Sequence, residues 1–227
     1  MRKIYFLFAS LLAGNFLFSQ ATPPPADDNS LSMANTQGLL RTQLTLTPSW
    51  MMKGTSGNDS TSISSARTNV YLHGTLEYYW TEHFSTRGDI YYFLNKNSAP
   101  GGLKKNHSLQ VGCSYHFMKG MSLDPYVGVC GGISLVQISP MDFMKGDSTF
   151  LPNYQVPSHL DPVWAPRVGM NFYGQHVFHF FVEAQYLMGT YRPAIGPILS
   201  INEIRISAGL GFNFVILHKE ATVRPAI

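Results

Sequence analysis

The chain has 227 residues, of which 44% are hydrophobic and 13% are charged, and it contains 15 Phe, 12 Tyr and 3 Trp. This composition is rich in aromatic residues and poor in charge for a soluble domain. The formal net charge is +3, and it becomes +1 (3 minus 2) if a leader that carries Arg2 and Lys3 is removed. So small a net charge predicts no extended basic surface for nucleic acid, which is therefore excluded as an expected partner.

Residues 1–20 predict a secretory signal peptide. Arg2 and Lys3 form a charged start, residues 4–18 are apolar, and Ser19 and Gln20 precede the expected cleavage site. The apolar run is too short, and its flanks are wrong, for a transmembrane anchor. After this segment there is no run of about 18 apolar residues, which excludes a helical membrane protein.

Residues 21–38 are rich in Pro, Asp, Asn and Ser, with three consecutive prolines at 23–25. Such a composition is typical of a flexible linker. The domain predicted to fold follows as residues 39–217, and residues 218–227 form a C-terminal tail.

The clearest pattern in the chain lies in residues 68–94. Apolar and polar side chains alternate up to Trp80 and, after a short break at 81–83, alternate again from Phe84. Because successive side chains of a strand point to opposite faces, this pattern predicts a β-hairpin with one apolar and one polar face. Pairing Trp80 with Phe84 sets Glu77 against Arg87 on the polar face, and we expect an ion pair there.

The same alternation recurs along the chain and predicts an all-β fold. Eight strands are expected, at residues 40–52, 68–80, 84–94, 107–117, 126–136, 163–173, 177–188 and 203–217. Pattern alone cannot say which face meets water. A soluble, lipocalin-like barrel would hide the apolar face, whereas a membrane barrel turns it to lipid.

The predicted connections alternate in length. Those after the first, third, fifth and seventh strands are long (53–67, 95–106, 137–162 and 189–202), and the intervening ones are short (81–83, 118–125 and 174–176). Outer-membrane barrels have long extracellular loops and short periplasmic turns. The prediction is therefore an eight-stranded antiparallel up-and-down transmembrane β-barrel with that arrangement of loops.

These features together resemble the small eight-stranded bacterial outer-membrane barrels, namely the OmpX type and the membrane domain of OmpA. The resemblance covers residues 39–217 and is one of architecture. Gln20 before the cleavage site further resembles signal peptides of Bacteroidota. The resemblance implies an outer-membrane location, a periplasmic linker and tail, and contact with membrane lipid and lipopolysaccharide. In that family the last strand usually ends the chain, whereas here residues 218–227 follow it.

A barrel of this size has room only for its own side chains. The charged side chains expected inside it, as a structural or gating network of ion pairs, are Glu77, Arg87, Asp89, Arg167, Glu183, Glu203 and Arg205. Pairing Phe172 with Phe178 would set Arg167 directly against Glu183.

The cysteines and histidines predict neither a disulfide nor a metal site. Pairing the predicted strands 107–117 and 126–136 sets Cys113 opposite Gly131 and facing outward, and Cys130 opposite Ser114 and facing inward, so two free thiols are expected. His73, His116 and His179 face inward at different heights, so they would not converge on one ion. No cofactor is expected.

Catalysis is not expected either. Gly146, Asp147 and Ser148 resemble the start of one esterase family, and His159 and Asp161 follow, but the Asp-x-x-His pair of that family is absent. No catalytic residue is therefore assigned, although some small barrels of this kind modify lipids.

The long loops carry the remaining candidates for function. Asp59-Ser60-Thr61 and Asp147-Ser148-Thr149 match the short pattern used for O-glycosylation in Bacteroidota, so Ser60 and Ser148 are possible acceptors. Loop 137–162 carries a set of apolar side chains that could contact a partner protein, namely Met141, Phe143, Met144, Phe150, Leu151 and Tyr154.

The function expected from the sequence is that of a non-enzymatic outer-membrane barrel. It would serve envelope integrity, adhesion or, as an accessory subunit, a larger outer-membrane complex, and its extracellular loops would carry the function. A small gated transport pore and a lipid-modifying enzyme stay open as alternatives.

Overall fold

A computed structural model describes residues 38–52, 68–95, 102–117, 122–144, 150–173, 177–193 and 198–215. The chain divides into two compact units, Met1–Ser32 and Met33–Ile227, and all described residues belong to the second. The predicted signal peptide, nearly all of the linker, and the tail lie outside the described residues.

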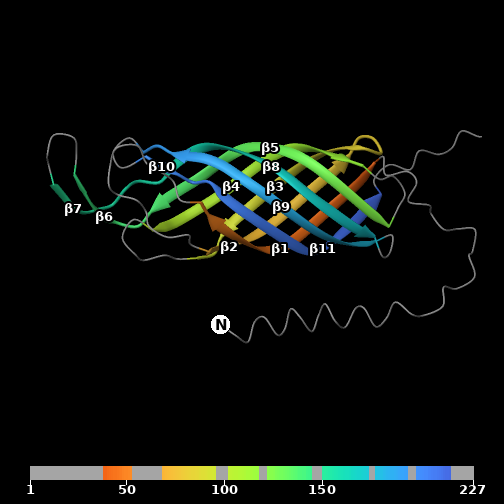
Figure 1. The fold of residues 1–227 in the computed structure, drawn as a ribbon, viewed down its shortest axis with the longest axis horizontal. Helices are drawn as coiled ribbons and strands as arrows, with labels where there is room; N and C mark the ends of the chain where they lie inside the picture. The colour runs from red at the N-terminus through yellow and green to blue at the C-terminus, as the bar shows by residue number, and fades with distance from the viewer. Residues whose placement is uncertain are drawn as a thin grey trace, which may run out of the picture. The chain divides into compact units, whose positions relative to one another are not determined.

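Eight long strands form one closed antiparallel sheet (Figure 1). They are β1 (Leu39–Met51), β2 (Thr68–Tyr79), β3 (Phe84–Phe93), β4 (Leu103–His116), β5 (Leu123–Ile138), β8 (His159–Tyr173), β9 (Phe178–Tyr191) and β11 (Glu203–Val215). Each pairs with the next of these strands along the chain, and β11 returns to pair with β1. The fold is therefore the predicted up-and-down barrel.

Three shorter strands lie in the longer connections. β10 (Leu199–Ser200) pairs with the end of β9. β6 (Met141–Met144) and β7 (Phe150–Tyr154) form a two-stranded sheet of their own, which stands beyond one end of the barrel in Figure 1. We call this the long-loop end, because the chain leaves β1, β3, β5 and β9 there, and we call the opposite end the short-turn end.

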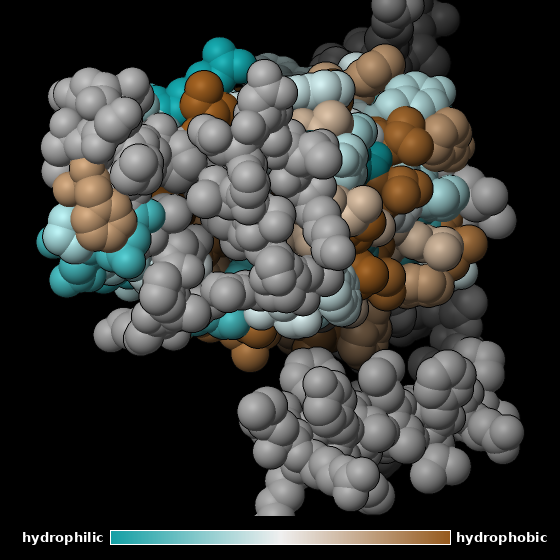
Figure 2. Space-filling model, turned by 60° about the vertical axis from the view of Figure 1, so that its left-hand side comes forward, coloured by the Kyte–Doolittle hydropathy of each residue, from teal (hydrophilic) through white to brown (hydrophobic). Residues whose placement is uncertain are grey.

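The alternation predicted from the sequence separates the two faces of the wall. Large apolar side chains stand exposed on the outside, among them Leu44, Leu76, Ile90, Val111, Trp164, Val182 and Phe212, and Figure 2 shows apolar groups gathered along the wall in view. Polar side chains are buried inside, including four arginines. This is the inverse of a soluble lipocalin-like barrel.

The predicted register is confirmed in one hairpin and wrong in two. Glu77 lies opposite Arg87 between β2 and β3, as expected. Between β8 and β9, however, Arg167 lies opposite Gln185 and not Glu183, and between β4 and β5 Cys130 lies opposite Gly112 and not Ser114. Both errors are shifts of two residues. Such a shift keeps every side chain on its face, so the alternation cannot detect it.

Several strands are longer than predicted. β4 begins at Leu103, β5 runs from Leu123 to Ile138, and β8 begins at His159, so the predicted loop 137–162 is largely β structure. These extensions break the simple alternation, for example through a β-bulge between Leu103 and Lys105. The described residues hold no helix that is long and apolar enough to cross a membrane.

Candidate functional site

The centre of the barrel interior holds a cluster of charged side chains from opposite walls, which we call the charged section (Arg87, Asp89, Arg167 and Glu183). Arg87 on β3 donates two hydrogen bonds across the lumen to Glu183 on β9, at 2.6 and 3.1 Å. Its Nε donates to Asp89 at 2.8 Å. Bidentate pairing of this kind is the strongest geometry for a guanidinium and a carboxylate.

Asp89 and Glu183 each have further partners. Arg167 on β8 donates to Asp89 Oδ2 at 2.7 Å, and its Nη1 lies 3.6 Å from Glu183. The Tyr126 hydroxyl donates to Glu183 at 2.7 Å, and His73 Nε2 lies 3.0 Å from Asp89. The four charged groups are almost fully buried, so their pairing offsets the loss of solvation.

The predicted ion pair between Glu77 and Arg87 is not the pairing that the structure uses. Glu77 accepts a hydrogen bond from Ser85 at 2.6 Å and lies 3.6 Å from Arg41 on β1, whereas Arg87 reaches Glu183. In so narrow a closed barrel a long side chain reaches the far wall, and directly opposed residues are not its only neighbours. The predicted pair of Arg167 and Glu183 does meet, diagonally, at 3.6 Å.

Glu203 and Arg205 lie between the charged section and the long-loop end. Glu203 accepts hydrogen bonds from Tyr71, from Asn106 at 2.6 Å and from Arg205 at 3.1 Å. The Arg205 guanidinium lies over the rings of Tyr71 and Tyr91, 4.4 and 4.3 Å from their centroids. The sequence predicts that both charges lie inside, and both side chains are buried in the structure.

Sequence reasoning missed a third charged group near the short-turn end. His116 places Nδ1 2.8 Å from Asp124 and Nε2 3.3 Å from Glu77, and only a doubly protonated ring donates to both. The Arg41 guanidinium lies between Tyr79 and Tyr173, 4.3 and 4.9 Å from the ring centroids. Arg41 could have been found from its place on the inward face, but Asp124 fell in a predicted turn.

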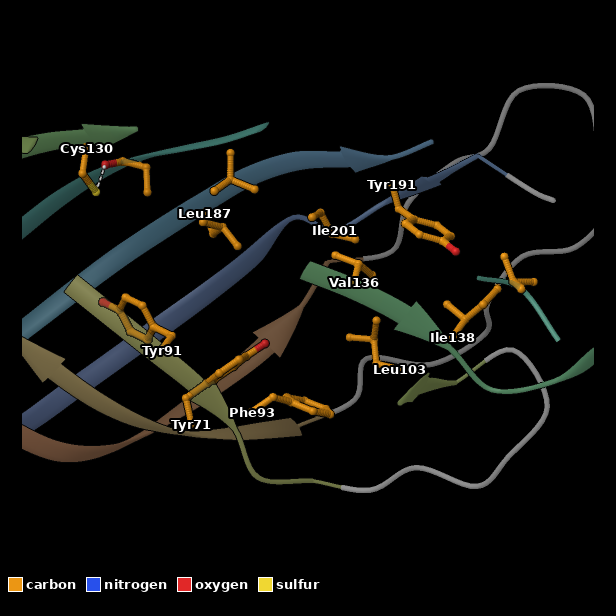
Figure 3. Close-up of a cluster of buried hydrophobic side chains, with 13 residues drawn as sticks. Tyr71, Tyr91, Phe93, Leu103, Cys130, Val136, Ile138, Leu187, Tyr191 and Ile201 are labelled. Carbon is orange, nitrogen blue, oxygen red and sulfur yellow. Dashed lines mark hydrogen bonds between the residues drawn. The ribbon is translucent and has the colours of Figure 1, made fainter. Parts of the chain in front are cut away.

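Apolar side chains fill the lumen at the long-loop end (Figure 3). We call this group the apolar plug, and it comprises Leu103, Val136, Ile138, Val156, Val163, Leu187, Tyr191 and Ile201. Val136, Val156, Leu187 and Tyr191 are each 0% exposed. The charged section is therefore covered by a hydrophobic layer at this end.

No protein-family model matches the sequence, and no curated protein matches it. Solved structures do match. Neisserial surface protein A has a TM-score of 0.52 and 13% identity, over 78% of this chain and 98% of its own. The outer membrane protein OprG from Pseudomonas aeruginosa has a TM-score of 0.52 and 12% identity, over 80% of this chain and 98% of its own. This chain has the fold of the small eight-stranded outer-membrane barrels.

Within this barrel the inward histidines have separate partners. His73 lies beside Asp89, His116 beside Asp124, and His179 Nε2 is 3.0 Å from Gln43. Across the described ranges, no three or more His, Cys, Asp or Glu side chains gather in a way that could hold a metal ion.

The two cysteines occupy opposite faces of the barrel wall, as predicted, and both are free. Cys113 is exposed and Cys130 is buried. Cys130 lies at the boundary between the apolar plug and the charged section, because its sulfur receives a hydrogen bond from Arg167 at 2.6 Å and donates to Gln110 at 3.0 Å.

The remaining predicted positions belong to the long connections. Ser60 and Ser148 are outside the described residues, so their possible glycosylation stays a prediction. His159 Nδ1 is 3.0 Å from Asp161 Oδ1, but the esterase-like residues 146–148 are also outside the described part. Of the apolar residues in loop 137–162, Phe150 is 56% exposed, and Tyr154 packs against the apolar plug.

Proposed function

We propose that this protein is a non-enzymatic, non-conducting outer-membrane barrel that displays its long-loop end outside the cell. In that position it would serve adhesion, envelope integrity or attachment to a larger outer-membrane complex. The observation that carries the proposal is the filled lumen. Ion pairs cross it in the middle, and the apolar plug covers them at the long-loop end.

A filled lumen favours a scaffold over a pore, because water and ions need a continuous polar path. Arg87 and Glu183 connect opposite walls by two hydrogen bonds. Moving an ion past them would require breaking this pair, and buried charges that lose their partners are costly.

The hairpin of β6 and β7 supports a role in display. It pairs with itself and not with the barrel wall, and it carries the exposed side chain of Phe150. An aromatic side chain that is exposed on such an element is available as an anchor for a partner, since aromatic residues are enriched among the residues that dominate binding. Binding to a cell surface or to a second membrane protein would use this element.

The experiment is planar-bilayer recording on the mature chain, after a shift in gel mobility on boiling has shown that the barrel is folded. We expect no discrete conductance steps. A folded preparation that opens in regular steps would contradict the proposal. In parallel, residues 141–154 are replaced by a short Gly-Ser linker. This variant should keep its mobility shift on boiling but no longer bind to a cell surface or to a second membrane protein.

A small gated pore is the second candidate, and one observation favours it. Both Asp89 and Glu183 contact both Arg87 and Arg167, so each arginine has a second carboxylate available. An exchange of partners could open a path through the charged section. Conductance steps that disappear when Arg87 is replaced by Met would support this candidate over the first.

A further inference from the structure

A β-bulge alters the outer wall of β4 at the long-loop end. Leu103 points into the apolar plug and Asn106 is buried in the lumen, yet Lys104 and Lys105 between them are both exposed. The pairing with β5 shifts by one residue between Leu103 and Lys105. A bulge adds one residue to a strand and interrupts the regular alternation of side chains between the two faces. The ammonium groups of the adjacent residues Lys104 and Lys105 therefore both lie on the outer wall.

His107 presents a hydrogen-bond donor next to these lysines. The backbone N–H of Phe93 donates to His107 Nδ1 at 3.1 Å. Since Nδ1 is an acceptor, the proton of the neutral ring lies on Nε2. The ring also stacks on Tyr92 of β3, with the centroids 4.5 Å apart. The imidazole is thus held in one orientation by a backbone group and by an aromatic ring.

Lys104, Lys105 and His107 lie at the edge of a belt of exposed apolar side chains on the outer wall. Ile90 and Leu109, which pair across β3 and β4 toward the short-turn end, are 59% and 51% exposed. Tyr92 follows on β3, at 56% exposed. Lys105 is two residues beyond His107, or about 7 Å along the strand. Aromatic residues of this kind mark the interface between the hydrocarbon and the headgroups of a membrane.

We propose that Tyr92, Lys104, Lys105 and His107 form a binding site for the phosphate of a lipid headgroup in the leaflet at the long-loop end. We call these four residues the basic patch. The inference rests on the membrane placement in the proposed function. Two ammonium groups and the Nε2–H donate to the phosphate oxygens, and hydrogen bonds between charged partners are about twice as strong as neutral ones. The acyl chains of the same lipid then lie against Ile90 and Leu109.

The charge on the described outer surface agrees with an anionic ligand. Lys104, Lys105 and Arg192 are exposed at the long-loop end, and the exposed carboxylate of Asp142 lies on β6, in the separate hairpin. Arg192 follows β9 and is separated from β4 in the barrel order by β5 and β8. It therefore offers a matched control, being an exposed cation near the same end of the wall but outside the basic patch.

The test uses the folded mature chain in a zwitterionic detergent, titrated with a short-chain phosphatidic acid and read by native mass spectrometry. The variants are K104Q/K105Q, H107F, which keeps an aromatic ring but lacks the donor, and R192Q as control. We expect K104Q/K105Q to weaken binding about 25-fold, from roughly a fivefold contribution per lysine. We expect a smaller loss for H107F and none for R192Q.

Two results would overturn the proposal: equal lipid binding by K104Q/K105Q and the unsubstituted chain, or displacement of the lipid by inorganic phosphate at the same concentration. The second would mean that the patch binds free phosphate. The mobility shift on boiling is measured on every variant. If the barrel is folded and non-conducting but the variants bind the lipid as well as the unsubstituted chain does, this inference alone is refuted. If the folded barrel conducts, the proposed function alone is refuted.

Discussion

Half-way along the lumen, packing depends on ion pairs that require particular partners, whereas at the long-loop end it depends on apolar contacts that any side chain of suitable volume can make. Arg87 has its strongest contact with one carboxylate, that of Glu183. Leu187 and Ile201 instead share a group of mixed aliphatic and aromatic neighbours. Losing one partner should therefore be more damaging in the charged section than in the apolar plug.

The largest effect is expected for Glu183→Ala. This change leaves Arg87 buried without its bidentate partner, and breaking a buried pair in this way costs about 3–5 kcal/mol of unfolding free energy. The measurement is reversible urea unfolding in lipid vesicles. The matched control is the double variant R87M/E183L, which replaces the pair with apolar groups. It should recover most of the loss, and a double variant as unstable as the single one would break the comparison.

Leu187→Ala tests the apolar plug. Removing a buried leucine side chain costs about 2–4 kcal/mol, from lost burial and from the cavity left behind. The control is Leu210→Ala on the outer wall, where the side chain is 47% exposed and leaves no internal cavity. Equal losses at the two positions in the same unfolding assay would mean that the plug is not tightly packed.

Gly169→Ala sharpens the comparison by adding volume to the charged section without changing its charge. A Cβ at Gly169 would meet the ring of Tyr126, which is held by its hydrogen bond to Glu183. Overpacking of this kind costs about 1–3 kcal/mol. Gly88→Ala is the control, because nothing lies within 4 Å of its added Cβ. An unfolding free energy equally low in both variants would refute the steric explanation.

The smallest effect concerns only the access of a thiol reagent to the two cysteines. In detergent, a membrane-permeant maleimide should label Cys113 on the outer wall of the folded barrel and reach Cys130, which is 2% exposed, only after unfolding. The variant C113S should then show no labelling before denaturation. Labelling of Cys130 in the folded state would mean that the boundary between the plug and the charged section opens to reagents.

The faces of the wall were predictable from the sequence because they depend on a period of two residues. The alternation placed Glu77, Glu183 and Arg205 inside, and the structure agrees. Two registers were not predictable, because a shift of two residues leaves every face unchanged. The ion pair between Arg87 and Glu183 was also not predictable, because it depends on the width of the closed barrel and not on the pairing of neighbouring strands.

The hairpin of β6 and β7 and the bulge at Lys104 were missed for a related reason. Each departs from the regular alternation, so the sequence pattern predicts a loop at both places. The plug was only partly visible in the sequence. Leu187 is an apolar residue at a position where the alternation of the predicted strand 177–188 expects a polar one. Val156 and Ile201 lie in connections, where strand periodicity says nothing about direction.

The ion pairs across the lumen also bear on how the barrel assembles. Arg87 and Glu183 are 96 residues apart, and Arg167 and Asp89 are 78 apart. A single hairpin of β2 and β3 entering a bilayer would bring Arg87 with Asp89 but without Glu183. Because contacts so distant in sequence form late, the free energy that compensates these charges is gained only as the later strands arrive. Insertion of strands one hairpin at a time is therefore disfavoured, and folding and insertion should proceed as one concerted event.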